Sequence, residues 1–78
     1  MKAWEIISEL EDAWEIKQKG GKYNDVTRAV LQFIPSQSRE ERTKAARRIM
    51  GMLEYSEGFV EFAAEHLKIK LRYQRRLL

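Results

Sequence analysis

Residues 2–19, KAWEIISELEDAWEIKQK, are the stretch that decides the fold. The large apolar side chains of this stretch recur at intervals of three, three and four residues: Trp4, Ile7, Leu10 and Trp14. Such spacing places them on one face of an α-helix. The pair Gly20 and Gly21 follows, which is typical of a helix C-terminus. We therefore expect an amphipathic helix over 2–19 with both tryptophans in the core. A partner contact is the alternative role for them, because tryptophan is enriched at binding hot spots.

A short second helix is expected over residues 25–34. Asn24 or Asp25 can cap its first turn, because their side chains accept hydrogen bonds from backbone N–H groups that have no partner inside the helix. Pro35 ends it, since the residue before a proline is pushed out of helical space. The expected buried stripe is Val26, Ala29, Val30 and Phe33, flanked by Leu31 and Ile34.

Two longer helices are expected after Pro35. Ser38 and Glu41 have the spacing of a capping box, in which each side chain binds the other residue's backbone N–H, and they predict a helix over 39–55. Its expected buried residues are Ala46, Ile49, Met50 and Leu53. Ser56 with Glu57 predicts the start of a fourth helix over 57–76.

The fourth segment carries a heptad-like seam and one conflicting pattern. The seam consists of Phe59, Phe62, His66, Ile69, Tyr73 and Arg76, and it raises the possibility of a homodimer mediated by this helix. Residues 67–74, LKIKLRYQ, alternate between apolar and polar, as a half-buried strand does. A single strand needs a partner and no second convincing strand is found, so the helix is favoured. The expected fold is all-α: a compact bundle of four helices in a single domain, residues 1–78.

Composition excludes several classes of protein. The chain of 78 residues has 44% hydrophobic residues, no cysteine and one histidine. These numbers argue against a disordered chain, a disulfide framework, a zinc finger and thiol catalysis. No apolar run approaches the roughly 18 residues of a membrane span, and the first residues lack the apolar core of a signal peptide. We expect a soluble protein of a reducing compartment, the cytoplasm, with no membrane association.

No catalytic, cofactor or metal site is predicted. His66 is the only imidazole, no Ser, Thr or acid can be placed beside it, and a packing role is favoured over a general base. Acidic pairs four residues apart, such as Glu61 and Glu65, are read as solvated helix faces. Gly20-Gly21-Lys22 lacks the spacing of a phosphate-binding loop. The chain is therefore expected not to be an enzyme.

Charge is ordered along the sequence. The formal net charge is +3, but residues 1–16 hold five acids and one lysine, and the remainder carries the positive excess. In most expected helices the acids come first and the bases last, which complements the helix macrodipole. A basic fourth helix lying beside the acidic first helix, within the chain or across a dimer, would satisfy both.

A small protein-interaction module, a regulator, adaptor or inhibitor, is the leading functional expectation. The C-terminal stretch is basic, aromatic and apolar at once, and it supplies the expected partner-binding residues: Arg72, Tyr73, Arg75, Arg76 and Leu77. Tyrosine and arginine are enriched at binding hot spots, and acidic groups of a protein partner would pair with the arginines.

Nucleic-acid binding is the alternative. Its expected contacts lie on the third helix and at the beginning of the basic tail: Arg39, Arg42, Lys44, Arg47, Arg48, Lys68 and Lys70. Clustered cations with an interleaved aromatic residue suit phosphates or single strands.

Overall fold

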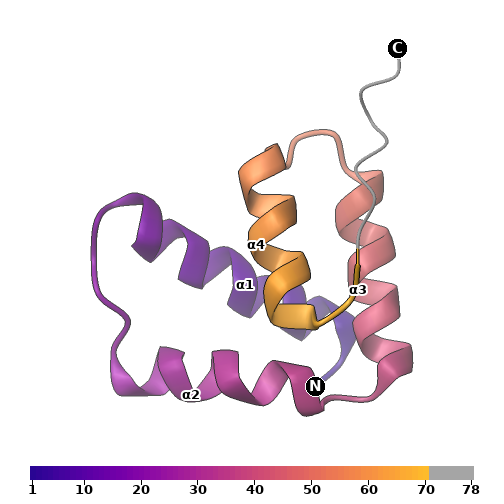
Figure 1. Cartoon of the computed structure of the whole chain (residues 1–78), viewed down its shortest axis with the longest axis horizontal. Helices are drawn as coiled ribbons and strands as arrows, with labels where there is room; N and C mark the ends of the chain where they lie inside the picture. Colours follow the sequence, from indigo (N-terminus) through magenta and orange to yellow (C-terminus); the bar gives the residue numbers. More distant parts are fainter. Residues whose placement is uncertain (71–78) are drawn as a thin grey trace.

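The computed structural model describes residues 1–70, and its four α-helices confirm the all-helical prediction. The elements are α1 (Ala3–Gln18), α2 (Asp25–Phe33), a 3₁₀ turn η1 (Ile34–Ser36), α3 (Arg39–Gly51) and α4 (Glu57–Leu67). In Figure 1, α1 and α2 run alongside each other, joined by the loop at Gly20, while α3 and α4 stand across them. Within residues 1–70 no segment forms a β-strand, and no helix is long and apolar enough to cross a membrane.

Side-chain caps fix three helix starts. Asn24 Oδ1 accepts the Thr27 N–H at 2.8 Å, and Ser56 Oγ accepts the Phe59 N–H at 3.1 Å. Ser38 Oγ likewise accepts the Glu41 N–H at 3.1 Å. Each bond satisfies a donor that has no partner inside its helix, so the predicted starts are confirmed to within a residue.

The predicted ends of the last two helices are wrong. The third helix stops at Gly51 rather than residue 55, because Met52 adopts an extended backbone. The fourth stops at Leu67 rather than residue 76, because Lys68 takes a left-handed conformation with φ of 57°. The seam predicted for a dimer is therefore interrupted after His66, and its later members Tyr73 and Arg76 lie outside the described residues. Residues 68–70 are neither helix nor strand.

The four helices share one core, in which small residues allow close packing. It contains five fully buried large side chains: Ile6, Leu10, Ile34, Ile49 and Leu67. Ala13 on α1 and Ala45 on α3 are also fully buried, and α1 and α3 are in extensive contact. Alanine removes the bulk that would hold two helices apart, so these backbones approach closely.

Several predicted core residues face solvent instead. Trp14 is partly buried against the core, but Trp4 is 63% exposed because it lies at the edge of the apolar arc of α1. On α2 the core takes Leu31 and η1 supplies Ile34, while the predicted stripe residues Val26 and Phe33 remain outside. Leu53 lies beyond the end of α3 and is 77% exposed.

Candidate binding surfaces

The predicted partner-binding residues lie outside the part of the chain that the structure describes. This applies to Arg72, Tyr73, Arg75, Arg76 and Leu77. Their role stays a prediction. The two lysines that precede them, Lys68 and Lys70, are exposed.

Arg42, predicted to contact nucleic acid, is bound within the fold. Its Nε donates a hydrogen bond to the carbonyl of Gln37 at 2.9 Å, and its Nη1 donates to the carbonyl of Leu67 at 2.8 Å. Leu67 is the last residue of α4, where helix carbonyls lack partners and partial negative charge accumulates. A half-buried guanidinium thus links the start of α3 to the end of α4 and places Lys68 near α3.

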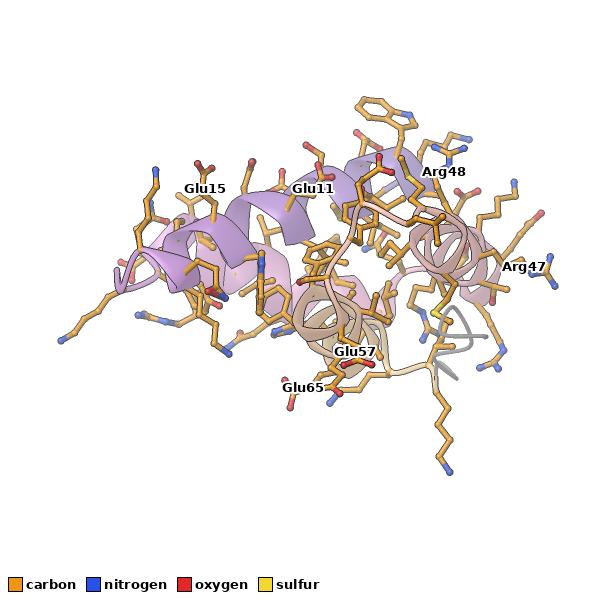
Figure 2. All side chains as sticks on the ribbon, turned by 90° about the horizontal axis from the view of Figure 1, so that it is seen from above. Glu11, Glu15, Arg47, Arg48, Glu57 and Glu65 are labelled. Carbon is orange, nitrogen blue, oxygen red and sulfur yellow. The ribbon has the colours of Figure 1, made fainter. Side chains whose placement is uncertain are left out.

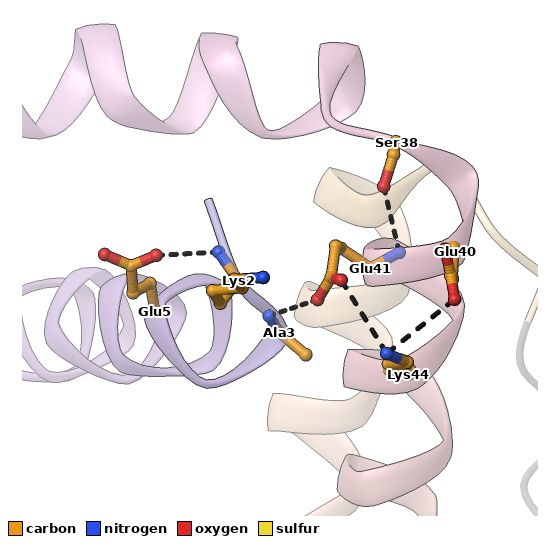
Figure 3. A network of polar contacts seen from close by, with 7 residues as sticks. All are labelled: Lys2, Ala3, Glu5, Ser38, Glu40, Glu41 and Lys44. Carbon is orange, nitrogen blue, oxygen red and sulfur yellow. Dashed lines mark hydrogen bonds and ion pairs between the residues drawn. The ribbon is translucent and has the colours of Figure 1, made fainter.

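Glu41 joins the starts of α3 and α1 (Figure 3). Its Oε1 accepts the backbone N–H of Ala3 at 2.8 Å, while its own N–H is capped by Ser38. The capping box predicted for α3 is therefore only half formed, because the Glu41 carboxylate serves the neighbouring helix. In α1, by contrast, the glutamate does bond to the start of its own helix: Glu5 accepts the Lys2 N–H at 2.7 Å.

The other predicted nucleic-acid contacts are unequally accessible. Lys44 lies 3.8 Å from a Glu40 oxygen and 3.7 Å from a Glu41 oxygen, so two carboxylates already balance its charge. Arg39, Arg47 and Arg48 are exposed, and none forms an ion pair with any residue from 1 to 70. In Figure 2, Arg47 and Arg48 extend from the edge of the molecule formed by α3.

An aromatic cluster connects α1 to α4. The Trp14 ring centroid lies 5.1 Å from that of Phe62 and 6.0 Å from that of Phe59. His66 packs edge-on against Phe62 with centroids 4.7 Å apart. Burial lowers the pKa of His66, as do the nearby cations Lys68 and Lys17, while Glu65 acts in the opposite direction. The imidazole is therefore mainly neutral at pH 7.

Tyr55 extends this cluster toward α1. Its ring centroid lies 4.7 Å from that of Phe59, and its hydroxyl donates to Glu11 Oε2 at 2.5 Å. Burial, the Glu11 hydrogen bond and the nearby acids Glu11 and Glu54 raise the pKa of Tyr55 to about 12, although Arg48 lowers it. The phenol is a neutral donor at physiological pH and holds the loop after α3 against α1.

The outer face of α2 is apolar and uncovered by residues 1–70. Val26 is 72% exposed and Phe33 is 59% exposed, and Ala29 between them is also exposed. These residues are spaced at three and four positions, so they form one stripe along the helix. Sequence reasoning recognised the stripe but assigned it to the core. The second apolar pair, Leu31 and Ile34, indicated that this segment has more apolar side chains than one buried face can hold, because the short helix and the turn after it are apolar on two sides.

A pocket of about 400 Å³ lies between α2 and the end of α4. Leu31 and Pro35 give it an apolar wall, and Tyr23 closes one side. Its remaining lining is polar or cationic: Arg28, Gln32, His66 and Lys68. No prediction from sequence joined these residues, because they come from two distant stretches, 23–35 and 66–68, which the packing of α4 against η1 brings together.

Comparisons with protein-family models, with curated proteins and with solved structures find no match to the chain. The helices and surfaces define a small all-helical domain. Within residues 1–70, no three His, Cys, Asp or Glu side chains are grouped closely enough to hold a metal ion.

Proposed function

We propose that this chain is a small non-enzymatic module that binds a protein partner, acting as a regulator, adaptor or inhibitor. The observation that supports this proposal is the outer face of α2, defined by Val26, Ala29 and Phe33. Two large apolar side chains there remain more than half exposed on a helix whose other side contributes to the core. Exposed apolar stripes of this kind are characteristic of helices that dock into a groove of another protein.

Charge around α2 indicates the chemistry of the partner. From Lys19 to Arg39, with both ends counted, the sequence has four basic residues and a single acid, Asp25. The Asp25 carboxylate is already 3.2 Å from the Arg28 guanidinium. The complementary surface is therefore an apolar groove with an acidic rim, since opposite potentials favour association and select among partners. The basic residues predicted to bind a partner, Arg72 to Arg76, would match the same acidic rim.

The test is affinity capture from the native cell, using a nuclease-treated lysate and three forms of the chain. The first is the natural chain, and the second carries Val26→Ser with Phe33→Ser. The third carries Leu53→Ser, a matched control because Leu53 is equally exposed but far from α2 in sequence. We expect the natural chain and the Leu53→Ser control to capture the same acidic protein. The purified acidic protein should bind the double variant at least tenfold more weakly than it binds the natural chain.

Three results would contradict this proposal. If the double variant captures the partner as well as the natural chain does, the α2 face is not the docking site. Capture abolished by nuclease would indicate nucleic acid instead. Sedimentation that shows a dimer, dissociated by the double variant, would assign the face to self-association.

Nucleic-acid binding remains the second candidate, supported by Arg47 and Arg48, which are exposed and form no ion pair with residues 1–70. The occupied Arg42 and Lys44 reduce the surface available for it. This candidate predicts binding of labelled single strands that weakens steeply between low and physiological salt. Replacing both arginines by glutamine should lower the salt slope by about two. Absence of binding even at low salt would refute it.

A further inference from the structure

We propose that the pocket between α2 and the end of α4 binds a small organic carboxylate, one anionic group on an apolar body. This site is separate from the proposed docking face. Arg28 lies two residues after Val26, so it projects from a roughly opposite side of α2. The proposal therefore stands or fails independently of protein binding.

Arg28 is oriented before any ligand arrives. Its Nη1 lies 3.2 Å from Asp25 Oδ1, and its Nη2 donates to the Tyr23 carbonyl at 3.1 Å. A guanidinium has five N–H donors in a rigid fork, so donors remain for a carboxylate. Holding the fork in place reduces the conformational entropy that binding would otherwise cost.

Lys68 supplies the uncompensated charge of the pocket. Asp25 balances Arg28, whereas Lys68 has no ion pair with any residue from 1 to 70. The other charged groups near His66 are Glu65 on its own helix and Lys17 on α1, which offset each other. A lining with about one excess positive charge suits a monoanion better than a phosphate dianion.

The end of α4 does not oppose an anion as strongly as a bare helix C-terminus would. Helix carbonyls at that end carry partial negative charge. Here Arg42 donates to the Leu67 carbonyl, and the backbone N–H of Lys68 bonds to the carbonyl of Ala64. Both carbonyls therefore already have donors.

The apolar part of the lining indicates the size and character of the uncharged part of the ligand. Leu31, Pro35 and the Tyr23 ring form a wall, and about 400 Å³ falls within the range of small-molecule sites. A single aromatic or short aliphatic body fits this volume. Gln32 and the neutral imidazole of His66 add neutral polar contacts at the edge.

His66, the only histidine, allows a direct test. Its imidazole resonances are followed by NMR during titration with benzoate, with benzamide as the neutral isostere and inorganic phosphate as the alternative anion. Benzoate should shift them saturably and raise the pKa of His66, because a bound anion favours the imidazolium. Benzamide should bind at least tenfold more weakly, since it lacks the charge.

Substitutions then separate the site from general charge effects. Arg28→Gln and Lys68→Gln should each weaken benzoate binding about tenfold, and Lys70→Gln, outside this lining, is the matched control. Asp25→Asn should tighten binding because it removes the carboxylate that neutralises Arg28, while the Tyr23 carbonyl still holds Nη2 in place, and this provides a gain if a loss variant folds poorly. Unsaturable shifts, equal effects of Lys68→Gln and Lys70→Gln, or tighter binding of phosphate than of benzoate would overturn the proposal.

Discussion

Arg42 joins three elements with one side chain. It reaches from α3 to the carbonyl that follows η1 and to the last carbonyl of α4. Hydrogen bonds from a charged donor contribute about 1.5–3 kcal/mol each when their loss leaves a partner unsatisfied. Its burial and its two acceptors distinguish it from the exposed arginines on the same helix.

Arg42→Met should lower the free energy of unfolding by about 3 kcal/mol, because the apolar stem is kept while both hydrogen bonds are lost. The low end of the range applies because the guanidinium is only half-buried. Urea denaturation would measure it. Arg47→Met, at an exposed position of the same helix, should change the value by less than about 0.5 kcal/mol. Equal effects of the two substitutions would show that the Arg42 contacts add nothing to stability.

Lys68 ends α4 in a conformation that suits glycine. Its φ of 57° crowds the Cβ of an L-residue against the backbone. Lys68→Gly should raise the free energy of unfolding by about 1 kcal/mol, and Lys70→Gly should give no such gain.

Gly20 has φ of 76° with no atom within 4 Å of an added Cβ, so Gly20→Ala should cost about 1 kcal/mol from backbone strain alone. A thermal melt that moves in the opposite direction for either variant would contradict this.

His66 couples stability to pH. Because its pKa is lowered in the fold, the unfolded chain binds a proton more readily as the pH falls below 6.5. This contribution to stability is complete above pH 6.5 and is lost as the pH falls through the folded-state pKa. An NMR titration should find that Lys17→Gln raises the pKa of His66, whereas Lys19→Gln leaves it unchanged, since Lys19 pairs with Glu15 instead. An unchanged value in Lys17→Gln would exclude that cation as a cause.

At the scale of elements, helix starts were predictable and helix ends were not. Asn24, Ser38 and Ser56 act within their own first turns, so the local sequence suffices. The end of α4 depends on Arg42, which lies 25 positions earlier. The sequence of residues 67–70 gives no sign of the Arg42 contact. The helical spacing of apolar residues also continues beyond Leu67, so it predicts a longer helix than the structure has.

The side of α2 that is buried was also beyond local reasoning. Val26 and Phe33 on one side and Leu31 with Ile34 on the other make equally plausible apolar faces. The choice follows from where α1 and η1 meet α2, which only tertiary packing defines. The pocket between α2 and the end of α4 also could not be predicted from local sequence, because its cations, Arg28 and Lys68, come from separate segments.

Substitutions on the two sides of α2 should therefore differ in effect. Leu31→Ala removes a buried side chain and should lower the free energy of unfolding by about 3 kcal/mol. Phe33→Ala should change it by less than about 0.5 kcal/mol, although phenylalanine is larger. Denaturant unfolding of both variants would test the assignment, and a larger loss for Phe33→Ala would reverse it.

At the scale of the molecule, the ion pairs of residues 1–70 lie within helices rather than between them. The ion pairs among residues 1–70 join side chains three or four positions apart, such as Lys19 with Glu15 and Arg28 with Asp25. Figure 2 shows Glu11 and Glu15 on the outside of α1, away from Arg47 and Arg48. The fourth helix is not basic as expected: α4 contacts α1 but ends at Leu67, before Lys68, so it contains no lysine or arginine.

Stability should accordingly depend little on ionic strength. Exposed pairs within one helix contribute roughly 0.3–0.5 kcal/mol each and are screened by salt. Raising sodium chloride from about 0.05 M to 1 M should change the free energy of unfolding by less than about 1 kcal/mol. A larger decrease, measured with urea at both salt concentrations, would reveal charge pairing between elements.

The two contacts at the start of α3 also affect how the chain opens. Glu41 holds the Ala3 amide, and Arg42 holds the Leu67 carbonyl, so segments far apart in sequence are fastened to the same helical turn. Helix ends usually fray independently and exchange their amide hydrogens quickly. Here neither the first turn of α1 nor the last turn of α4 can detach without releasing α3. The Ala3 amide hydrogen should therefore exchange with solvent as slowly as amides in the middle of the helices.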